Sequence, residues 1–583
     1  MPFYHKKNLL FAILSGLILA LAYPGWGIDL GWLVWIGFIP LFWALKESPA
    51  EKEDNKHFWN KKLFSLGFLA GFIYFSIVFR WIWSLHPLTT LGIENGWISF
   101  FTVGAVWLIT SAGVSLPWGI AITFFGSIAR KFNSPVFQTR KLTTYYLPIG
   151  QAGLLLAAPA VFTLSEYIRS FFFGLTWYGS GTLVGPHWTI GSPVYALANN
   201  PLALKLSSFV GIYGVFFLII IVNFLVWHFW GQNLESLKKL SFKNRKIFIL
   251  IAVVASLTMV PSLLNWISTK ENDSITGPQI NYALVQTSFP TKSIYEASEL
   301  LNYFKEQIEI LKKIAGEYPE TNIIVLPESS NLFKNISLFQ TTEQTGEFFK
   351  KLFDNPTIII DNSTVTNSTG SSLSRVVSAD SSQGALGYYD KKLLSPGGEF
   401  LPYSIKLFMR IFKPKELSLY IHGKGLTPGA KDVSTVNLDN NYRVSPIICS
   451  ELFAPSLVNL TTRSSDVITV LTSNSIFRGS SSLIGQNLAI AKFRAAENNR
   501  PLLLSANSGL SYAIDNKGRV RNIAEDQDQK LLTGTIAIKN PRSWYNEHGD
   551  NPILLGSLML AGMGFIRFRK LKFKISHPNS EHF

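Results

Sequence analysis

The chain has 583 residues, of which 47% are hydrophobic and 15% are charged, and its formal net charge is +16. Its length allows more than one domain, and so apolar a composition does not fit a protein that is water-soluble throughout. The clearest basic clusters flank long apolar runs, so we expect no nucleic-acid partner, which would need a basic patch on a soluble face. These clusters are better explained as topology signals that also touch anionic lipid.

The apolar residues are unevenly distributed along the chain. Residues 1–267 hold almost all the long apolar runs, whereas residues 275–545 have the composition of a soluble domain, rich in Asn, Ser, Lys and Glu. We therefore predict a transmembrane domain of seven helices over residues 1–267 and a soluble domain over residues 275–545. A last apolar run predicts a C-terminal transmembrane helix at 552–566, followed by a basic cytoplasmic tail at 567–583.

A helix of roughly 20 apolar residues crosses a bilayer core, and the positions of Lys and Arg indicate which side of the membrane each loop occupies. The candidate spans are residues 8–23, 29–45, 63–84, 97–127, 147–168, 206–230, 247–266 and 552–566. Basic residues precede the first span, follow the second, fourth and sixth, and close the chain, whereas the alternate loops contain neither Lys nor Arg. This pattern places the soluble domain on the outer side of the membrane and the tail in the cytoplasm.

Within the soluble half, runs of β-type residues alternate with helical periodicity, which is typical of a layered α/β sandwich. We expect strands at 280–286, 322–326, 357–361, 467–472, 501–506 and 531–538, and helices at 294–315 and 482–498. The segment 362–385 is rich in Ser, Thr and Asn, and we expect exposed loops there.

Three further features mark the ends of apolar strands. The run Val444–Ile448 stops at Cys449, which is the only cysteine of the chain, and Ile323–Leu326 is followed by Pro327 and Glu328. A third run, from Gly387, ends in Lys391 and Lys392. A thiol attacks well only as a thiolate, so it needs a base and a cation nearby. If the three strand ends meet, the set favours acyl transfer through a covalent thioester.

In that arrangement Glu328 acts as general base, because burial after an apolar strand raises its pKa. Lys391 stabilises the developing oxyanion, with the backbone N–H of Ser450 as a second donor. Each residue also has a structural alternative. Cys449 alone fits an inert buried hydrophobe, Glu328 fits a turn cap or an ion pair, and the two lysines fit surface charge. Glu399 and Glu451 fit ion-pair partners.

Taken together, the motifs resemble the nitrilase superfamily, and within it the bacterial apolipoprotein N-acyltransferases. The resemblance rests on Leu326–Ser329, Tyr389–Lys391, Pro396–Pro402, Ile447–Glu451, Thr472–Asn474, Arg494–Pro501, Ser165–Arg169 and Leu175–Trp177. It covers nearly the whole chain, and Pro396–Pro402 is the most specific piece. It implies a membrane domain joined to an αββα sandwich.

The resemblance assigns roles residue by residue. It implies Glu328 as general base, Lys391 as oxyanion stabiliser and Cys449 as nucleophile, with Glu399 supporting their geometry and Glu451 as an acidic residue near the thiol. Trp177 matches a tryptophan on a membrane-side loop that faces the active site, and Phe477 lies in a segment expected to contact lipid. Two departures stand out: Ser450 follows the nucleophile where the family often has Tyr, and Asn474–Gly479 replaces the pattern Asn-Asp-x-Trp-Phe-Gly.

The implied activity is a two-step acyl transfer from a membrane phospholipid, through a Cys449 thioester, to the free amine of the diacylglyceryl-cysteine at the N-terminus of a lipoprotein. We expect a multi-pass protein of the bacterial inner membrane with a periplasmic catalytic domain, a monomer without organic cofactor or metal. One alternative is a membrane-tethered amidohydrolase that uses water in the second step. Another is a transporter or scaffold, for which Arg80, Glu166 and Arg169 would line a path. Their positions near span ends instead predict charges that reach the membrane surface.

Overall fold

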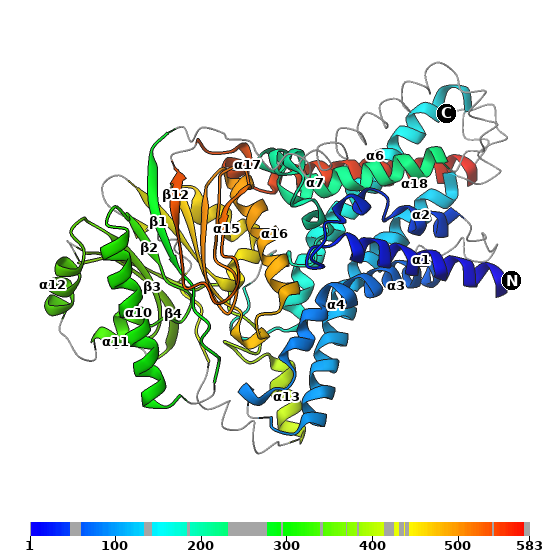
Figure 1. Ribbon diagram of the computed structural model, residues 1–583. Coiled ribbons are helices and arrows are strands. Elements are labelled where there is room, and N and C mark those ends of the chain that lie inside the picture. The colour runs from blue at the N-terminus through cyan, green and yellow to red at the C-terminus, as the bar shows by residue number, and fades with distance from the viewer. Residues whose placement is uncertain are drawn as a thin grey trace.

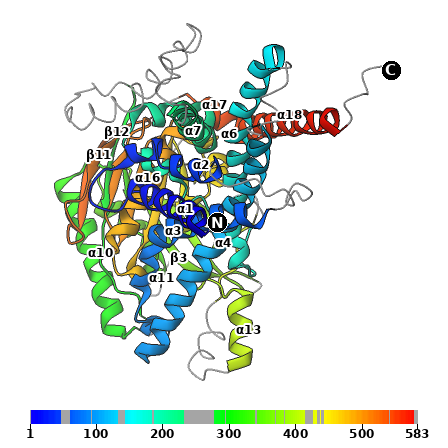
Figure 2. The ribbon, with the colours of Figure 1, turned by 90° about the vertical axis from the view of Figure 1, so that its right-hand side faces the viewer.

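The computed structural model contains a bundle of long helices and an α/β domain that lie against each other (Figure 1). It describes residues 2–46, 60–91, 93–132, 143–183, 187–230, 277–292, 295–337, 342–368, 370–381, 384–412, 425–430, 436–437, 442–538 and 541–576. The predicted span at 247–266 lies outside the described residues. Figure 2, which views the molecule from the helical side, shows α1 and α4 in front of the α/β domain.

The helical part is built from elements that match the apolar runs of the sequence. They are α1 (Pro2–Ala22), α2 (Ile39–Lys46), α3 (Lys61–Val78), α4 (Gly96–Phe132), α6 (Thr143–Thr176), α7 (Pro201–Trp230) and α18 (Asn551–Ser576), with the 3₁₀ helices η1 (Gly31–Trp35), η3 (Phe79–Leu85), η4 (Thr89–Leu91) and η5 (Pro193–Leu197). Among the described residues, three helices are long and apolar enough to cross a membrane, namely 61–85, 96–126 and 201–227. They are consistent with a membrane protein.

The run at 29–45, which was expected to be one span, is not a single regular helix. It divides into η1 and α2, and the backbone groups freed by the break are bound by Asn223 of α7. The Asn223 side chain accepts a hydrogen bond from the Phe38 N–H at 2.9 Å and donates one to the Val34 carbonyl at 2.9 Å. An apolar environment tolerates a broken helix only where such partners exist. No periodicity within 29–45 could reveal a partner so distant in sequence.

The α/β domain consists of two sheets packed face to face. The described strands form one six-stranded sheet in the order β12-β1-β2-β3-β4-β5 and a second in the order β11-β10-β9-β8-β7-β6. The first contains β1 (Gln279–Val285), β2 (Ile323–Val325), β3 (Ile358–Thr366), β4 (Ser372–Asp380), β5 (Gly384–Asp390) and β12 (Leu531–Ala537). The second contains β6 (Val436–Asn437), β7 (Arg443–Ile448), β8 (Val467–Ser473), β9 (Leu502–Asn507), β10 (Tyr512–Ile514) and β11 (Val520–Ile523).

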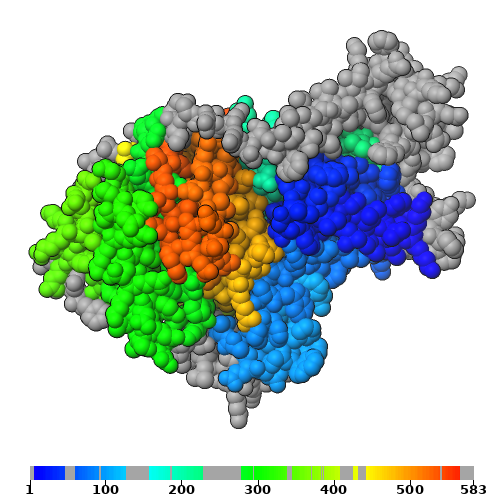
Figure 3. All heavy atoms as spheres, viewed as in Figure 1, coloured from blue at the N-terminus to red at the C-terminus, as the bar shows by residue number. Residues whose placement is uncertain are grey.

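Helices cover both outer faces, which confirms the predicted αββα sandwich (Figure 1). The first sheet packs against α10 (Ala297–Glu317), α11 (Leu332–Ser337) and α12 (Thr342–Leu352). The second is covered by α15 (Pro455–Thr462) and α16 (Ser481–Asn498). One continuous apolar core runs from the outer face of the second sheet into the helical part. Figure 3 shows the two parts in contact on this face of the molecule.

The expected exposed loops at 362–385 instead contain the end of β3, the whole of β4 and the start of β5, all in the first sheet. β3 continues to Thr366 and pairs antiparallel with β4, which pairs with β5. Residues of β4 alternate between buried and less buried positions, as in a sheet with one covered face. The buried Asn362 side chain accepts a hydrogen bond from the Ser329 N–H at 2.8 Å. Ser, Thr and Asn in this segment therefore belong to paired strands and hydrogen-bond neighbouring backbone groups, and they do not mark a loop.

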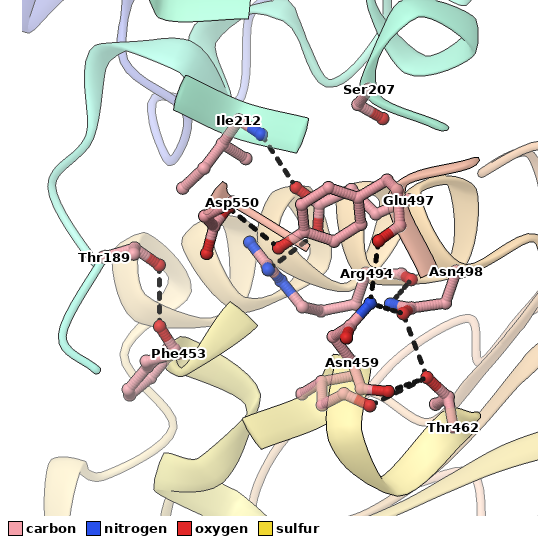
Figure 4. A network of polar contacts seen from close by, with 12 residues as sticks. Thr189, Ser207, Ile212, Phe453, Asn459, Thr462, Arg494, Glu497, Asn498 and Asp550 are labelled. Carbon is pink, nitrogen blue, oxygen red and sulfur yellow. Dashed lines mark hydrogen bonds and ion pairs between the residues drawn. The ribbon is translucent and has the colours of Figure 1, made fainter. Parts of the chain in front are cut away.

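A buried polar network fixes the α/β domain to the helical part (Figure 4). Arg494 of α16 lies 2.7 Å from Glu497, and both side chains are 0% exposed. The second oxygen of Glu497 accepts a hydrogen bond from the Ile212 N–H of α7 at 3.0 Å. That N–H is free because α7 breaks at Gly211, whose φ is 60°. The short helix α17 (Trp544–His548) closes the network from the other side, since the Asn546 side chain donates to Asn498 at 2.9 Å.

Candidate active site

Three strand ends from both sheets meet at one point. Glu328 follows β2, Lys391 follows β5 and Cys449 follows β7. The Lys391 ammonium lies 2.8 Å from Oε1 of Glu328 and 2.8 Å from Oε1 of Glu399. The structure therefore brings together the groups that the sequence pattern placed at separate strand ends.

The backbone turns sharply at the thiol. Cys449 has φ 45°, a left-handed conformation that costs free energy for a residue with a side chain and is often kept at functional sites. The chain passes directly from β7 into the short 3₁₀ helix Cys449–Phe453. The Sγ atom accepts a hydrogen bond from Oγ1 of Thr472 at 3.5 Å. This turn places Cys449 at the rim of the core between the sheets, against which it packs, and leaves it exposed to the cavity.

Glu451 joins the thiol turn to the strand that carries Lys391. One of its oxygens accepts hydrogen bonds from the Lys392 N–H at 2.7 Å and from the Tyr389 hydroxyl at 2.8 Å. The other accepts the Ile448 N–H at 2.9 Å. Ser450 makes a parallel link, because its hydroxyl donates to the Leu393 carbonyl at 2.6 Å. Glu451 is thus a buried connection between two strand ends, which differs from the ion pair considered as an alternative.

Lys391 is 1% exposed and is held by the two carboxylates. Glu399 is itself oriented by the Ser395 N–H, which donates to its second oxygen at 2.7 Å. Lys392 occupies a different environment, with its ammonium 5.5 Å from the centre of the Tyr389 ring. Of the two adjacent lysines, Lys391 is the one that faces Glu328.

The electrostatics of the cluster favour a neutral thiol next to an ion-paired lysine. Burial raises the pKa of the Cys449 thiol to about 12, and the nearby Glu328 charge adds to the shift. Burial also raises the pKa of Glu328, although the charge of Lys391 partly opposes it. Burial alone lowers the pKa of Lys391, but Glu328 and Glu399 outweigh it and raise that pKa well above its usual value. The sulfur therefore becomes nucleophilic only when a base removes its proton during attack.

A cavity of about 380 Å³ opens from the thiol into the helical part. Its lining combines Glu328, Lys391 and Cys449 with many apolar residues of the helical part. Trp177 follows α6 and lines the cavity, with its Nε1–H donating to Oγ1 of Thr110 at 3.0 Å. Phe477 lines it as well and lies edge-on to Trp81, with ring centres 5.1 Å apart. Such a space fits a long hydrocarbon chain whose reacting carbon lies at the sulfur.

Sequence reasoning gave no role to three residues of the site. Thr472 contacts the sulfur, Tyr389 contacts Glu451, and Trp81 forms part of the cavity wall. Thr472 and Tyr389 stand inside motifs that resemble the family, which is a signal of importance but not of contact. Within the described ranges, no group of three or more His, Cys, Asp or Glu side chains is arranged to hold a metal ion.

The charges of the helical part do not form the predicted arrangement. Arg169 and Glu166 were expected to reach the membrane surface, but their side chains are 0% and 2% exposed and form a bidentate ion pair at 2.8 Å. Arg169 also donates to the Ile190 carbonyl at 3.1 Å. The pair is enclosed because the segment after α6 folds back over it. Arg80 is partly buried, with its guanidinium 3.7 Å from the Trp26 ring centre.

Comparison with known proteins matches both halves of the chain. The family described as "Apolipoprotein N-acyltransferase N-terminal domain" matches residues 15–225, and the family "Carbon-nitrogen hydrolase" matches residues 282–546. The chain is 24% identical to the apolipoprotein N-acyltransferase of Geobacter metallireducens, covering 96% of both chains. It is 23% identical to that of Shewanella oneidensis, covering 84% of this chain and 90% of the relative. For the Thermotoga maritima protein of the same name, the identity is 24%, over 93% of this chain and 90% of the relative.

Solved structures similar to the chain match only part of it. Saccharomyces cerevisiae Nit3, a member of branch 10 of the nitrilase superfamily, is 15% identical with a TM-score of 0.33, and the match covers 46% of this chain and 92% of that one. A carbon-nitrogen hydrolase from Helicobacter pylori is 15% identical with a TM-score of 0.33, covering 51% of this chain and 97% of that one.

Proposed function

The chain belongs to the apolipoprotein N-acyltransferase family, a membrane-bound branch of the nitrilase superfamily, and on this premise we propose how it acts. It is an acyltransferase that moves a fatty acyl chain from a membrane phospholipid to the N-terminal amine of a diacylglyceryl-modified lipoprotein. The observation that carries the proposal is the cavity in which Cys449 and Lys391 share one space with apolar residues of the helical part. A lipid can thereby place its ester carbonyl at the sulfur while its chain stays among apolar side chains.

In the first half-reaction Glu328 takes the thiol proton of Cys449 as the sulfur attacks the ester carbonyl carbon. The carbonyl oxygen becomes an oxyanion, which Lys391 and the backbone N–H of Ser450 stabilise. The tetrahedral species collapses when the carbon–oxygen bond to the glycerol breaks. The leaving alkoxide receives the proton from Glu328, so the products are a lysophospholipid and a thioester on Cys449.

In the second half-reaction the neutral amine of the lipoprotein attacks the thioester carbonyl. Glu328 accepts the proton that the amine loses, and the same donors hold the oxyanion. Collapse breaks the carbon–sulfur bond and releases an amide, and the thiolate of Cys449 recovers the proton from Glu328. The two substrates use one site in turn, which gives ping-pong kinetics.

The remaining site residues hold this geometry in place. We assign Glu399 to the position of Lys391, because it contacts the ammonium at 2.8 Å and is oriented by the backbone of Ser395. Glu451 fixes the nucleophile turn relative to the lysine strand through its bonds to Ile448 and Lys392. Trp177 and Phe477 form walls for the acyl chain.

We further propose a multi-pass protein of the bacterial inner membrane, acting as a monomer with its α/β domain in the periplasm. The start of α1 and the end of α18 lie at the end of the molecule remote from the sheets (Figure 1), which fits a cytoplasmic location for both. The Lys and Arg residues near those two ends support the same orientation.

Acyl transfer to a synthetic diacylglyceryl-cysteine peptide tests the proposal and distinguishes an acyltransferase from an amidohydrolase. The full chain in detergent micelles is mixed with a phospholipid carrying a labelled acyl chain and with the peptide. An N-acylated peptide with a lysophospholipid supports the proposal, whereas free fatty acid without acylated peptide would favour the amidohydrolase. Cys449→Ser should give no acylated peptide while unfolding at the temperature of the parent. Transfer at the parental rate by that variant would exclude Cys449 as the nucleophile, whereas neither acylated peptide nor free fatty acid from the parent would favour a transporter or scaffold.

A further inference from the structure

The segment Asn474–Gly479 lies at the wall of the cavity and departs from the family pattern that the motifs resemble. It contains Phe477 and Arg478 where that pattern has Trp and Phe. The structure places a short 3₁₀ turn at Ser475–Phe477 and ends it at Arg478, whose φ is 51°. This conformation directs the Arg478 side chain away from the catalytic domain and towards the loop between η3 and α4.

Arg478 binds two consecutive carbonyl groups of that loop. Its Nη1 donates to the His86 carbonyl, and its Nη2 donates to the Pro87 carbonyl at 2.7 Å. The receiving loop is itself anchored to α4, because the Ser99 hydroxyl contacts Nδ1 of His86 at 2.9 Å and accepts the Leu88 N–H at 2.8 Å. The guanidinium is therefore attached to a fixed part of the helical bundle.

Other polar contacts of the segment run to its own domain. The Ser475 hydroxyl contacts those of Thr291 and Ser473, and the Asn474 N–H donates to the Asn507 carbonyl at 2.8 Å. Among the described residues, Arg478 provides the polar bonds that join this segment to the helical part. Its role is thus separable from that of the buried network around Arg494 shown in Figure 4.

The bonds of Arg478 lie beside a pair of rings that belong to different halves of the chain. Phe477 precedes Arg478 and meets Trp81 of η3 edge to face, at 5.1 Å between ring centres and 87° between ring planes. Both rings line the cavity that contains Cys449. Because most of the helical part and most of the catalytic domain separate the two rings in sequence, their spacing depends on contacts between the two halves.

We propose that Arg478 is a positioning residue that fixes the Phe477–Trp81 ring pair as the wall that selects the acyl chain of the donor. The inference rests on the proposed function, since it takes the cavity to hold a phospholipid acyl chain. An acyl chain long enough to reach the two rings gains packing from a fixed wall, whereas a shorter chain does not contact it. Loosening the wall therefore weakens long donors selectively and leaves the chemistry at Cys449 unchanged.

The test measures thioester formation on the full chain with phospholipids of one headgroup and increasing acyl length. Arg478→Met keeps the side-chain length and removes both hydrogen bonds, so we expect KM for long donors to rise about fivefold. The value of kcat and the KM for short donors should stay at the parental level. Arg478→Lys retains one donor group and should restore part of the loss, and Phe477→Ala should give the same dependence on chain length as Arg478→Met.

Arg521→Ala is the matched control, because this arginine also makes short polar contacts, to Asp515 at 2.7 Å, but does not line the cavity. It should leave the chain-length profile unchanged. A KM that rises equally for all chain lengths in Arg478→Met would overturn the proposal and indicate that Arg478 binds the donor phosphate. A profile identical to that of the parent would overturn it as well. If the parent itself forms no thioester with any donor, the proposed function fails, and this inference fails with it.

Discussion

Removing the Lys391 ammonium tests whether this cation neutralises the two buried carboxylates of the site and stabilises the oxyanion. The group lies 2.8 Å from Glu328 and 2.8 Å from Glu399, and it is 1% exposed. Lys391→Met keeps most of the side-chain volume but leaves two adjacent carboxylates without their cation. Removing one partner of a buried ion pair costs about 3–5 kcal/mol of stability. Losing a pre-positioned oxyanion donor slows the chemical step by about 100- to 1000-fold.

The stability loss of Lys391→Met should depend on pH in one direction. Burial raises the pKa of Glu328, and the Lys391 charge that lowers it is gone in the variant, so this pKa rises further. A carboxyl group with a higher pKa in the folded state favours folding below its unfolded pKa, and that advantage is lost as pH rises through the folded value. The difference in unfolding free energy between parent and variant should therefore be smaller at acidic than at neutral pH.

Thermal unfolding across pH and single-turnover acylation of Cys449 provide the assay. Lys392→Met is the control, because its ammonium makes a contact with the Tyr389 ring at 5.5 Å and does not face Glu328. Lys392 is buried, and a desolvated cation–π contact is worth about 2 kcal/mol, so the variant should lose some stability. Because the Lys392 ammonium lies at the Tyr389 ring, we expect the acylation rate of the variant to stay within about fivefold of the parent. Equal loss of acylation in the two variants would refute the assignment of Lys391. If the loss of unfolding free energy in Lys391→Met does not change with pH, the claim that Lys391 neutralises Glu328 is wrong.

Three other variants and one control test the framework around the site. Glu451→Gln places an N–H group against a backbone N–H donor of Ile448 or Lys392, so it should lower the free energy of unfolding by about 1–3 kcal/mol and lower Tm. An unchanged Tm would contradict the role of Glu451 in joining the two strand ends. Gly211→Ala sets a Cβ 2.4 Å from the Tyr545 ring and should lower Tm, whereas Gly556→Ala, with no atom within 4 Å of the added Cβ, should not. Burial raises the pKa of Glu497 from 4.5 to about 7, so the parent should lose stability as pH rises across this interval. Glu497→Gln should make stability depend less on pH. Some dependence should remain, because burial raises the pKa of Asp550 to about 6. Equal pH dependence of stability in parent and variant would contradict its assignment to Glu497.

The part of the site that could be predicted from the sequence is the part encoded by local pattern. Glu328, Lys391 and Cys449 each follow a run of buried strand residues, and strand ends on one side of a sandwich gather at one edge. The motif Pro396–Pro402 placed Glu399 near them, and the structure has Glu399 in contact with Lys391. The layered α/β architecture followed from the alternation of strand and helix patterns.

The remaining features depend on contacts between distant segments. Asn223 binds the broken backbone at Phe38 from another helix, and Glu451 reaches Tyr389 across the two sheets. Arg478 contacts a loop that precedes it by most of the chain. At 362–385 the pattern of Ser, Thr and Asn favoured loops because Asn has low β propensity and all three side chains can hydrogen-bond the backbone in turns. There, pairing between β3 and β4 overrides the local preference.

The most direct measurement is the intact mass of the full chain after incubation with phospholipid in the absence of an amine acceptor. We expect an increase equal to one acyl group, located on the peptide that contains Cys449, lost on treatment with hydroxylamine and absent from Cys449→Ala. The adduct should disappear when a diacylglyceryl-cysteine peptide is added, with an equal amount of N-acylated peptide formed. Steady transfer by a protein that never carries an acyl group on Cys449, or an adduct on another residue, would contradict the thioester mechanism.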